Sequence, residues 1–529
     1  MAQIVILCVA FLAIYFLRRR LFSRKDKQLP LPPGPSGLPL VGNIQDLPAP
    51  GAVEFQHWLR HKDLYGPISS VTVLGQTMII IHDKDIALEL MEKRASIHSG
   101  RPKMKFGFDL VGWINTMSSL QYGHTHRLYR KYAYQQLGSK AVVSKYWPLQ
   151  EAVVGRALWR IYCDNGGNLT KHLKTEVGEL ILKLVYGYTI EPKKNDPLVD
   201  RVDEVMEQFS EAVVPGRWLV DIIPSLEHLP EWLPGAGFKR TARLWRKTLM
   251  DCVSIPYEYV KQQKKFEKSE RSLVSSAIDQ AVHEKTLDSE VEHAIKWTAV
   301  SLYTGGADTS VIIMSAFFLA MSMHPDVQRK AQEEIDRVVG TSRLPTFGDR
   351  ENLPYINAIV DEAQRWHPLA VMGLPHASDK EDTINGYRIP KGSLLLPAVW
   401  WYTRDPEVYH NPEAFKPERY FEPYSEPSAT TFTWGFGRRI CPGRVLADSS
   451  LYLTFVQALA LFDIRCPIDD NGKGLKQLHD YESGLLCRPK PFKVVVRPRS
   501  KEHEITVQRI IERYPFENSG AGQLQSIGL

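Results

Sequence analysis

One cysteine framed by glycines constrains the fold of this 529-residue chain more than any other feature. Gly435 and Gly437 precede Cys441, and Gly443 follows it. Glycines permit a tight loop in which the backbone comes close to a flat ligand. The other cysteines are scattered without short-spaced pairs, which argues against a disulfide framework and against a Cys-rich zinc site. Any chemistry of Cys441 is therefore expected to involve this cysteine alone.

The residues after Cys441 predict the start of a helix. Pro442 and the apolar run from Val445 are typical of a first helical turn. A cysteine at a helix N-terminus faces free N–H groups, so we expect a lowered thiol pKa and a thiolate. A Gly-rich phosphate loop is excluded, because Ile440 stands where a dinucleotide fingerprint requires glycine and no Gly-Lys-Ser/Thr follows.

The segment around Cys441 resembles the haem-binding loop of the cytochromes P450. The family pattern Phe-x-x-Gly-x-Arg-x-Cys-x-Gly is matched at Gly437, Arg439, Cys441 and Gly443, and Trp434 replaces the phenylalanine. The resemblance implies that haem b (iron protoporphyrin IX) binds here, with the Cys441 thiolate as axial ligand of the iron. It further implies that Trp434 packs beneath the porphyrin and that the other matched residues contact the cofactor.

Two further segments, in the order that the family requires, carry three charged residues. Glu362 and Arg365 stand at i and i+3 of a predicted helix, which taken alone is a surface ion pair. Arg419 follows in a Pro-Glu-Arg segment. The resemblance implies that the three residues form a buried structural triad behind the haem. Breaking such a network is expected to cost on the order of 3–5 kcal/mol.

A long apolar helix is predicted over residues 289–323, with Gly305 and Gly306 in its middle. Each glycine costs about 1 kcal/mol relative to alanine in a helix, so the pair needs a reason. One reason for the pair is a notch that lets a neighbouring helix pack closely. The resemblance implies another, a groove for dioxygen on the distal haem face. Asp308 and Thr309 then match the acid–alcohol pair that supplies protons during oxygen activation.

Three other residues are candidate contacts to the haem propionates. Arg130 matches the arginine of the family's Trp-x-x-x-Arg helix, and His126 replaces the tryptophan. An imidazole can still donate to a propionate, and a His-x-His metal site with His124 is the alternative. His376, in the strand that the resemblance places beside the haem, is either a third propionate contact or a structural residue.

The walls of the substrate pocket are assigned by their family positions, although each residue can equally belong to an ordinary core. The assigned residues are apolar, and none carries a fixed charge. They are Met104, Phe106, Phe108, Trp113, Leu302, Val371, Met372, Leu374, Leu485 and Leu486. Such a lining favours a hydrophobic small molecule, for example a terpenoid. It does not distinguish a terpenoid from an alkaloid, a polyketide or a fatty acyl chain.

The N-terminus is predicted to be a membrane anchor. Residues 4–17 are uninterrupted apolar, and Arg18, Arg19 and Arg20 follow. Because the basic cluster follows the apolar run and no small-residue cleavage site ends it, an uncleaved anchor is favoured over a cleaved signal peptide. The positive-inside rule then leaves the rest of the chain in the cytosol, so we expect single-pass attachment to the endoplasmic reticulum membrane. The apolar segment 215–237, followed by basic residues, is either a buried loop or a second, shallow membrane contact.

The rest of the sequence shows mostly helical spacing, with β-hairpins predicted at residues 71–81 and around Asn385-Gly386. We therefore expect a mainly α fold with small β-sheets, a single large cytochrome P450-type domain preceded by an N-terminal transmembrane helix. The expected divisions are residues 1–22 as the anchor with its basic stop, 23–43 as a Pro-rich hinge, 44–515 as the haem-thiolate monooxygenase domain and 516–529 as a disordered tail.

The resemblance implies a monooxygenase that uses O2 and hydroxylates or further oxidises a hydrophobic molecule. Residues 373–376 and 483–492 resemble microsomal fungal enzymes of secondary metabolism. No flavin or nicotinamide domain is evident, so NADPH is expected to act through a flavoprotein reductase that docks on Arg438, Arg444 and Lys416. The net charge of +6 does not indicate nucleic-acid binding. A haem-thiolate isomerase or dehydratase without a reductase, and a haem sensor, are the alternatives.

Overall fold

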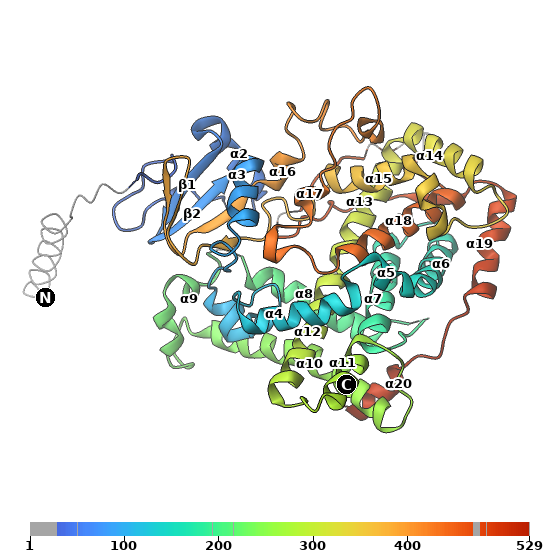
Figure 1. The fold of residues 1–529 in the computed structure, drawn as a ribbon, viewed down its shortest axis with the longest axis horizontal. Helices are drawn as coiled ribbons and strands as arrows, with labels where there is room; N and C mark the ends of the chain where they lie inside the picture. Colours follow the sequence, from blue (N-terminus) through green and yellow to red (C-terminus); the bar gives the residue numbers. More distant parts are fainter. Residues whose placement is uncertain are drawn as a thin grey trace, which may run out of the picture.

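The computed structural model describes residues 29–49, 51–192, 194–214, 216–468, 475, 477–482 and 484–527. The described chain is mainly helical with small sheets (Figure 1), as the sequence predicts. The longer helices are α2 (Glu54–Tyr65), α4 (His124–Leu137), α6 (Trp147–Cys163), α7 (Leu169–Tyr186), α8 (Pro197–Ala212), α10 (Gly237–Lys265), α11 (Leu273–His283), α12 (Ser289–Ala307), α13 (Thr309–Met323), α14 (Pro325–Val338), α15 (Pro354–Trp366), α18 (Arg444–Leu461) and α19 (Lys501–Arg513). The short helices are α3 (Lys84–Leu88), α5 (Lys140–Val143), α9 (Leu219–Ile222), α16 (Val399–Tyr402), α17 (Thr430–Thr433) and α20 (Ala521–Leu524).

Two of the three sheets in the described residues contain the predicted hairpins. Strands β1 (Ile68–Val73) and β2 (Gln76–Ile81) pair antiparallel through a turn in which Leu74 and Gly75 have positive φ. The four-stranded sheet has the order β1-β2-β6-β3, with β6 at Leu394–Pro397 and β3 at His376–Ala377. The second hairpin, β4 (Asp382–Ile384) and β5 (Tyr387–Ile389), turns at Asn385 and Gly386, which also have positive φ. Strands β7 (Phe462–Arg465) and β8 (Val495–Pro498) form a third, antiparallel sheet.

Two hydrophobic cores hold the fold together. The larger lies among the helices, where α12 packs against α4 and α7, and α13 packs against α15 and α18. Stacking of Phe317 on Phe455, at 3.8 Å between ring centroids, joins α13 to α18. The smaller core lies between the four-stranded sheet and helices α2, α3 and α16, at the end of the molecule that carries β1 and β2 (Figure 1).

The predicted N-terminal transmembrane helix lies in residues 1–28, outside the described residues. Within the described ranges, the helical run Ser289–Met323 is long and apolar enough to cross a membrane, but 78% of its most apolar window is buried inside the protein, as expected for a core helix. The described part of the Pro-rich segment hydrogen-bonds to strands β1 and β5, which belong to different sheets. The Pro33 carbonyl accepts the Ser70 N–H at 2.8 Å, and the Pro30 carbonyl accepts the Arg388 N–H at the same distance.

Residues 516–527 belong to the segment that the sequence predicts to be a disordered tail. Helix α20 lies here, and Leu524 is 1% exposed. The Gly520 N–H donates to the Thr189 carbonyl at 2.9 Å, and a side chain on Gly520 would collide with Tyr188. Small residues in this segment therefore permit close packing against the body, although their composition is typical of a disordered terminus.

Candidate active site

The glycines before Cys441 shape the loop that holds it. Gly435 and Gly437 have φ of 82° and 49°, a region of backbone conformation that other residues rarely adopt. A Cβ on Gly437 would lie 2.5 Å from the Met91 carbonyl oxygen, so the loop approaches the neighbouring backbone closely. The Cys441 N–H donates to the carbonyl of Trp434 at 2.8 Å and closes the loop. Helix α18 begins at Arg444, which confirms the predicted helix start.

The pKa of the Cys441 thiol is raised, contrary to the expected lowering. Burial is the main cause. The backbone N–H groups of Gly443 and Arg444 and the guanidinium groups of Arg130 and Arg444 act in the opposite direction, as a helix N-terminus predicts, but they do not outweigh burial. A metal cation bound to the sulfur would favour the thiolate at this position.

The long helix breaks at the two residues predicted to form the acid–alcohol pair. Helix α12 ends at Ala307 and α13 begins at Thr309, with Asp308 between them. The Thr309 hydroxyl donates to the Gly305 carbonyl at 2.7 Å. This carbonyl belongs to the preceding helical turn, so its hydrogen bond is made by a side chain. A groove at this turn, which the resemblance implies, is compatible with this local geometry.

The two adjacent glycines of α12 have different surroundings. A Cβ on Gly306 would lie 2.9 Å from the Ile181 side chain of α7, so this glycine is a packing notch. A Cβ on Gly305 would meet no heavy atom within 4 Å. Packing thus explains Gly306 only, while Gly305 leaves open space beside the helix break.

Asp308 does not hydrogen-bond to Thr309 among the contacts of the described residues; its carboxylate instead pairs with Arg488. The Asp308 side chain is 5% exposed and that of Arg488 is 37% exposed. Arg488 lies in the C-terminal segment that also carries Leu485 and Leu486. Sequence analysis missed this partner, because nothing in the spacing links residues 180 positions apart.

Five basic side chains gather near the Cys441 loop. Arg439, predicted to bind the cofactor, donates to the carbonyls of Ser99, Met117 and Leu120 at 2.8–3.3 Å. The charges of the three arginines each lower the pKa of at least one other member of this cluster. The members are Arg101, His126, Arg130, His376 and Arg439.

Burial and mutual repulsion make this cluster electrostatically unfavourable by itself. Burial, with the nearby Arg439, lowers the pKa of Arg101 to about 9, and burial with Arg130 lowers that of Arg439 to about 10. Burial and the surrounding arginines lower the pKa of His126 to about 3, so its ring is neutral. The buried Nδ1 atom of His126 has no hydrogen-bond partner.

The chemistry of this cluster fits an anionic ligand. Over the described ranges, none of Arg101, Arg130 and Arg439 forms an ion pair with a carboxylate. Buried charges normally have partners. A haem placed over Cys441 brings two propionates, which would compensate these guanidinium groups and accept from His126. Arg101, which the sequence analysis missed, has no local signal that distinguishes it from a surface arginine.

The structure separates the two histidines of the His-x-His alternative. The His124 side chain is 75% exposed, whereas His126 is 2% exposed. They therefore do not form a joint metal site. His376 is buried, and its Nδ1 lies 2.7 Å from the carbonyl oxygen of His98.

The predicted charge triad is assembled and fully buried. Arg365 and Arg419 both bind the Glu362 carboxylate, at 2.8 and 3.0 Å. A fourth member was not predicted, because Glu426 binds Arg419 at 2.5 Å and balances the second positive charge. Tyr420 adds a hydroxyl donor to Glu362 at 3.2 Å.

The predicted pocket residues are divided between the two hydrophobic cores. Phe108, Trp113 and Leu302 belong to the helical core, whereas Val371 and Met372 belong to the sheet core. Met104 and Leu485 pack on the helical core, Leu374 is 37% exposed and Leu486 is half-buried.

The structure corrects the assignment of Phe106 to the wall of the substrate pocket. Its side chain is fully buried, with the ring stacked on Trp218 at 3.6 Å and edge-on to Trp245. The Phe106 N–H donates to Asp221 of α9 at 2.7 Å. Phe106 therefore fixes residues 105–111 to the α9–α10 region and has no surface available for a substrate.

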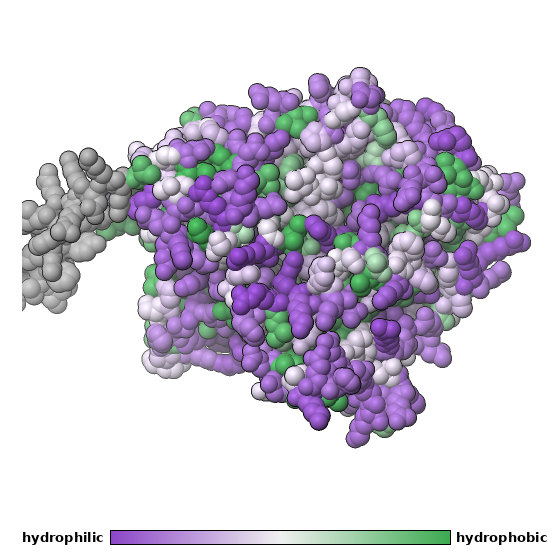
Figure 2. All heavy atoms as spheres, viewed as in Figure 1, coloured by the Kyte–Doolittle hydropathy of each residue, from purple (hydrophilic) through white to green (hydrophobic). Residues whose placement is uncertain are grey.

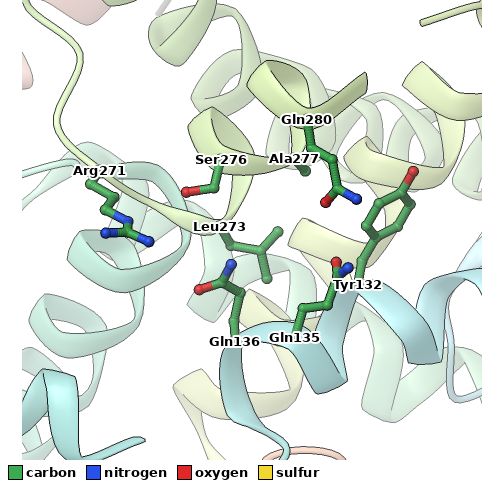
Figure 3. A pocket seen from close by; sticks show the side chains of 8 residues that line it. All are labelled: Tyr132, Gln135, Gln136, Arg271, Leu273, Ser276, Ala277 and Gln280. Atoms are coloured by element: carbon green, nitrogen blue, oxygen red, sulfur yellow. The ribbon is translucent and has the colours of Figure 1, made fainter. Parts of the chain in front are cut away.

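A cavity of about 280 Å³ lies elsewhere, between α4 and α11 (Figure 3). Its lining is largely polar, and none of the predicted site residues contributes to it. The lining residues are Tyr132, Gln135, Gln136, Arg271, Leu273, Ser276, Ala277 and Gln280.

The fold and the cysteine loop are those expected of a haem-thiolate protein, and similarity to known proteins identifies the family. Residues 32–496 match the cytochrome P450 family. The chain is 44% identical to cytochrome P450 monooxygenase CLM2 of Gibberella zeae, over 99% of each chain. It is 42% identical to the multifunctional cytochrome P450 monooxygenase af510 of Aspergillus fumigatus, over 98% of this chain and 96% of that one.

It is also 36% identical to the O-methylsterigmatocystin oxidoreductase of Aspergillus flavus, over 98% of this chain and 97% of that one. The chain thus belongs to the cytochrome P450 family and is a monooxygenase of that family. Membership implies a haem with a cysteine thiolate ligand and the use of O2, which the residues around Cys441 fit.

Proposed function

We propose that this chain is a membrane-anchored monooxygenase that hydroxylates, or further oxidises, a hydrophobic product of fungal secondary metabolism. The observation that carries the proposal is the break between α12 and α13, where the Thr309 hydroxyl binds the Gly305 carbonyl beside open space. Haem bound to Cys441 supplies the oxygen-activating chemistry. The balanced reaction takes a C–H bond, O2, two electrons and two protons to an alcohol and water.

The residues of this chain supply binding, water exclusion and protons. Thr309 carries a hydroxyl at the helix break, and the neighbouring Asp308, paired with the partly exposed Arg488, is the carboxylate that we propose to pass protons from solvent. Arg101, Arg130, Arg439 and His126 hold the cofactor through its propionates.

The exposed basic residues near Cys441 are the proposed docking surface for the reductase. Arg438 and Arg444 are exposed on either side of the cysteine, and Lys416 is half-buried. The Arg438 guanidinium lies over the Tyr122 ring at 4.5 Å, which holds this charge at the surface. An acidic NADPH-dependent flavoprotein reductase fits this surface, and docking is expected to weaken with salt.

The substrate is proposed to be a hydrophobic small molecule such as a terpenoid. The residues that support this proposal are apolar and carry no charge: Phe108, Trp113 and Leu302 in the helical core, and Val371 and Met372 in the sheet core. A pocket lined this way favours apolar over ionic ligands.

The proposed membrane attachment has two parts, the apolar residues 4–17 and the surface of the 216–237 segment. In that segment Leu219, Ile223 and Trp232 are 65%, 48% and 80% exposed, while Val220 is buried. The face of the molecule in Figure 2 is mostly hydrophilic, with separate apolar spots. Exposed apolar side chains followed by basic Arg240 and Arg243 suit a shallow contact with the endoplasmic reticulum membrane.

Product analysis in a heterologous host tests the proposal. The full chain is expressed with a microsomal flavoprotein reductase, and extracts are fed candidate terpenoids with NADPH. We expect products heavier by oxygen atoms, which disappear when reductase or O2 is omitted. Products that form without reductase and O2 would support an isomerase or dehydratase instead. Absence of NADPH consumption with every substrate would support a haem sensor.

A further inference from the structure

Arg488 is held in place by backbone contacts on both sides. Its carbonyl accepts the Glu482 N–H at 2.8 Å, and the Cys487 N–H donates to the Leu369 carbonyl at 2.9 Å. The Cys487 carbonyl lies 2.9 Å from Nε2 of the buried His367, and Pro489 bridges to Tyr481. The arginine is therefore not a mobile surface residue, because its backbone is fastened to the end of α15.

From this fixed backbone the Arg488 guanidinium reaches the Asp308 carboxylate at the helix break. A carboxylate that is 5% exposed is normally paired, and Arg488 is its partner. Because 37% of the Arg488 side chain is exposed, the ion pair connects solvent to Asp308, the residue beside Thr309. Thr309 itself donates backwards to Gly305, so its hydroxyl oxygen remains able to accept a proton donor.

We propose that Arg488 is a positioning residue for oxygen activation, fixing the Asp308 carboxylate where solvent protons enter the helix break. The inference rests on the proposed roles of Asp308 and Thr309. Without Arg488 the carboxylate loses its fixed orientation, and protons reach the break less often. Incompletely protonated oxygen then leaves as hydrogen peroxide, from O2, two electrons and two protons, instead of being reduced to water by four electrons and four protons.

The test uses the haem-containing full chain with reductase, NADPH and O2 as the only reactants, so that no substrate is needed. We expect Arg488→Gln to raise severalfold the fraction of O2 released as peroxide, and Arg488→Lys to restore part of the wild-type ratio. Lys490→Gln is the matched control, because Lys490 lies in the same segment but pairs with the exposed Asp480. The control is expected to behave as the wild type.

A thermal double-mutant cycle provides a readout independent of turnover. Asp308→Asn and Arg488→Gln are expected to lower the Tm by similar amounts, and the double variant no further than either single one. Additive Tm losses, or a peroxide fraction in Arg488→Gln equal to the wild-type value, would overturn the inference. If Arg488→Gln fails to fold, the Tm and the peroxide fraction of Arg488→Lys and Asp308→Asn are compared with those of the wild type instead. Failure of the wild type to reduce O2 would instead contradict the proposed function.

Discussion

The guanidinium of Arg130 donates a hydrogen bond of 2.6 Å to the carbonyl oxygen of Ile440, the residue before Cys441. Helix α4 is thereby attached to the cysteine loop at the place where a haem must bind. The sequence assigned Arg130 to a propionate. A guanidinium has five N–H donors, so the observed bond to Ile440 leaves donors for that second partner.

Arg130→Gln is expected to weaken haem retention, because it removes a charge-assisted bond and a positive charge near the thiolate. Loss of one such bond costs about 1.5–3 kcal/mol, or roughly ten- to a hundredfold in haem affinity. Haem transfer to an excess of apomyoglobin measures it. Arg127→Gln is the control, since Arg127 lies on the same helix with an exposed side chain. Equal haem loss in both variants would argue against a specific role of Arg130.

The charge network of Glu362 predicts a large stability difference. Arg419→Gln leaves Glu362 and Glu426 buried without their shared cation, so we expect a loss of about 3–5 kcal/mol in the free energy of unfolding. Glu333→Gln disrupts the pair with Arg329, in which both side chains are about 60% exposed, and should cost under about 1 kcal/mol. Urea unfolding followed by circular dichroism distinguishes the two costs. Similar small losses would show that the network is not structural.

Glu176 predicts a pH dependence of stability. Burial raises its pKa to about 8, and its Oε2 atom has no hydrogen-bond partner. Between pH 4.5 and 8 the folded protein keeps this proton while the unfolded chain releases it. The contribution of Glu176 to stability therefore falls as pH rises through this window, by up to about 1.4 kcal/mol per pH unit.

Glu176→Gln is expected to remove that slope, since the amide does not titrate and its oxygen can still accept from Thr454. Thermal unfolding at pH 5 and pH 8 checks this. The variant should gain stability relative to the wild type at pH 8 but not at pH 5. A difference that does not change with pH would mean that Glu176 does not titrate in this range.

The proposed docking surface predicts a salt-dependent loss of reductase activity. Arg438→Glu reverses an exposed charge beside the thiolate loop, so reductase-supported reduction of the haem should slow severalfold at low ionic strength. The difference from wild type should shrink at high salt. Lys265→Glu, an exposed reversal at the end of α10, is the control. Equal slowing by both reversals would indicate a general charge effect instead of docking.

The elements that depend on local sequence could be predicted. The two hairpin turns follow from Gly75 and from Asn385-Gly386, residues that tolerate positive φ, and the start of α18 follows from the residues after Cys441. Glu362 and Arg365 lie on one helix face, so their ion pair could be predicted from the sequence as well.

What sequence reasoning missed depends on burial and on distant contacts. Arg101 and Glu426 are ordinary charged residues until the fold buries them, and Arg488 meets Asp308 only because the C-terminal segment returns to the helix break. Phe106 was assigned to the pocket by position, but its ring packs on Trp218. For the Cys441 thiol, the helix N-terminus gave the expected contribution, and burial exceeded it.

The most direct test of the account is the carbon monoxide difference spectrum of the reduced protein, measured beside Cys441→His. Thiolate ligation predicts the red-shifted Soret band for the wild type, and its loss in the variant with haem still bound. A wild-type protein that binds haem but lacks this band, or a variant that retains it, would contradict the assignment of Cys441 as the ligand.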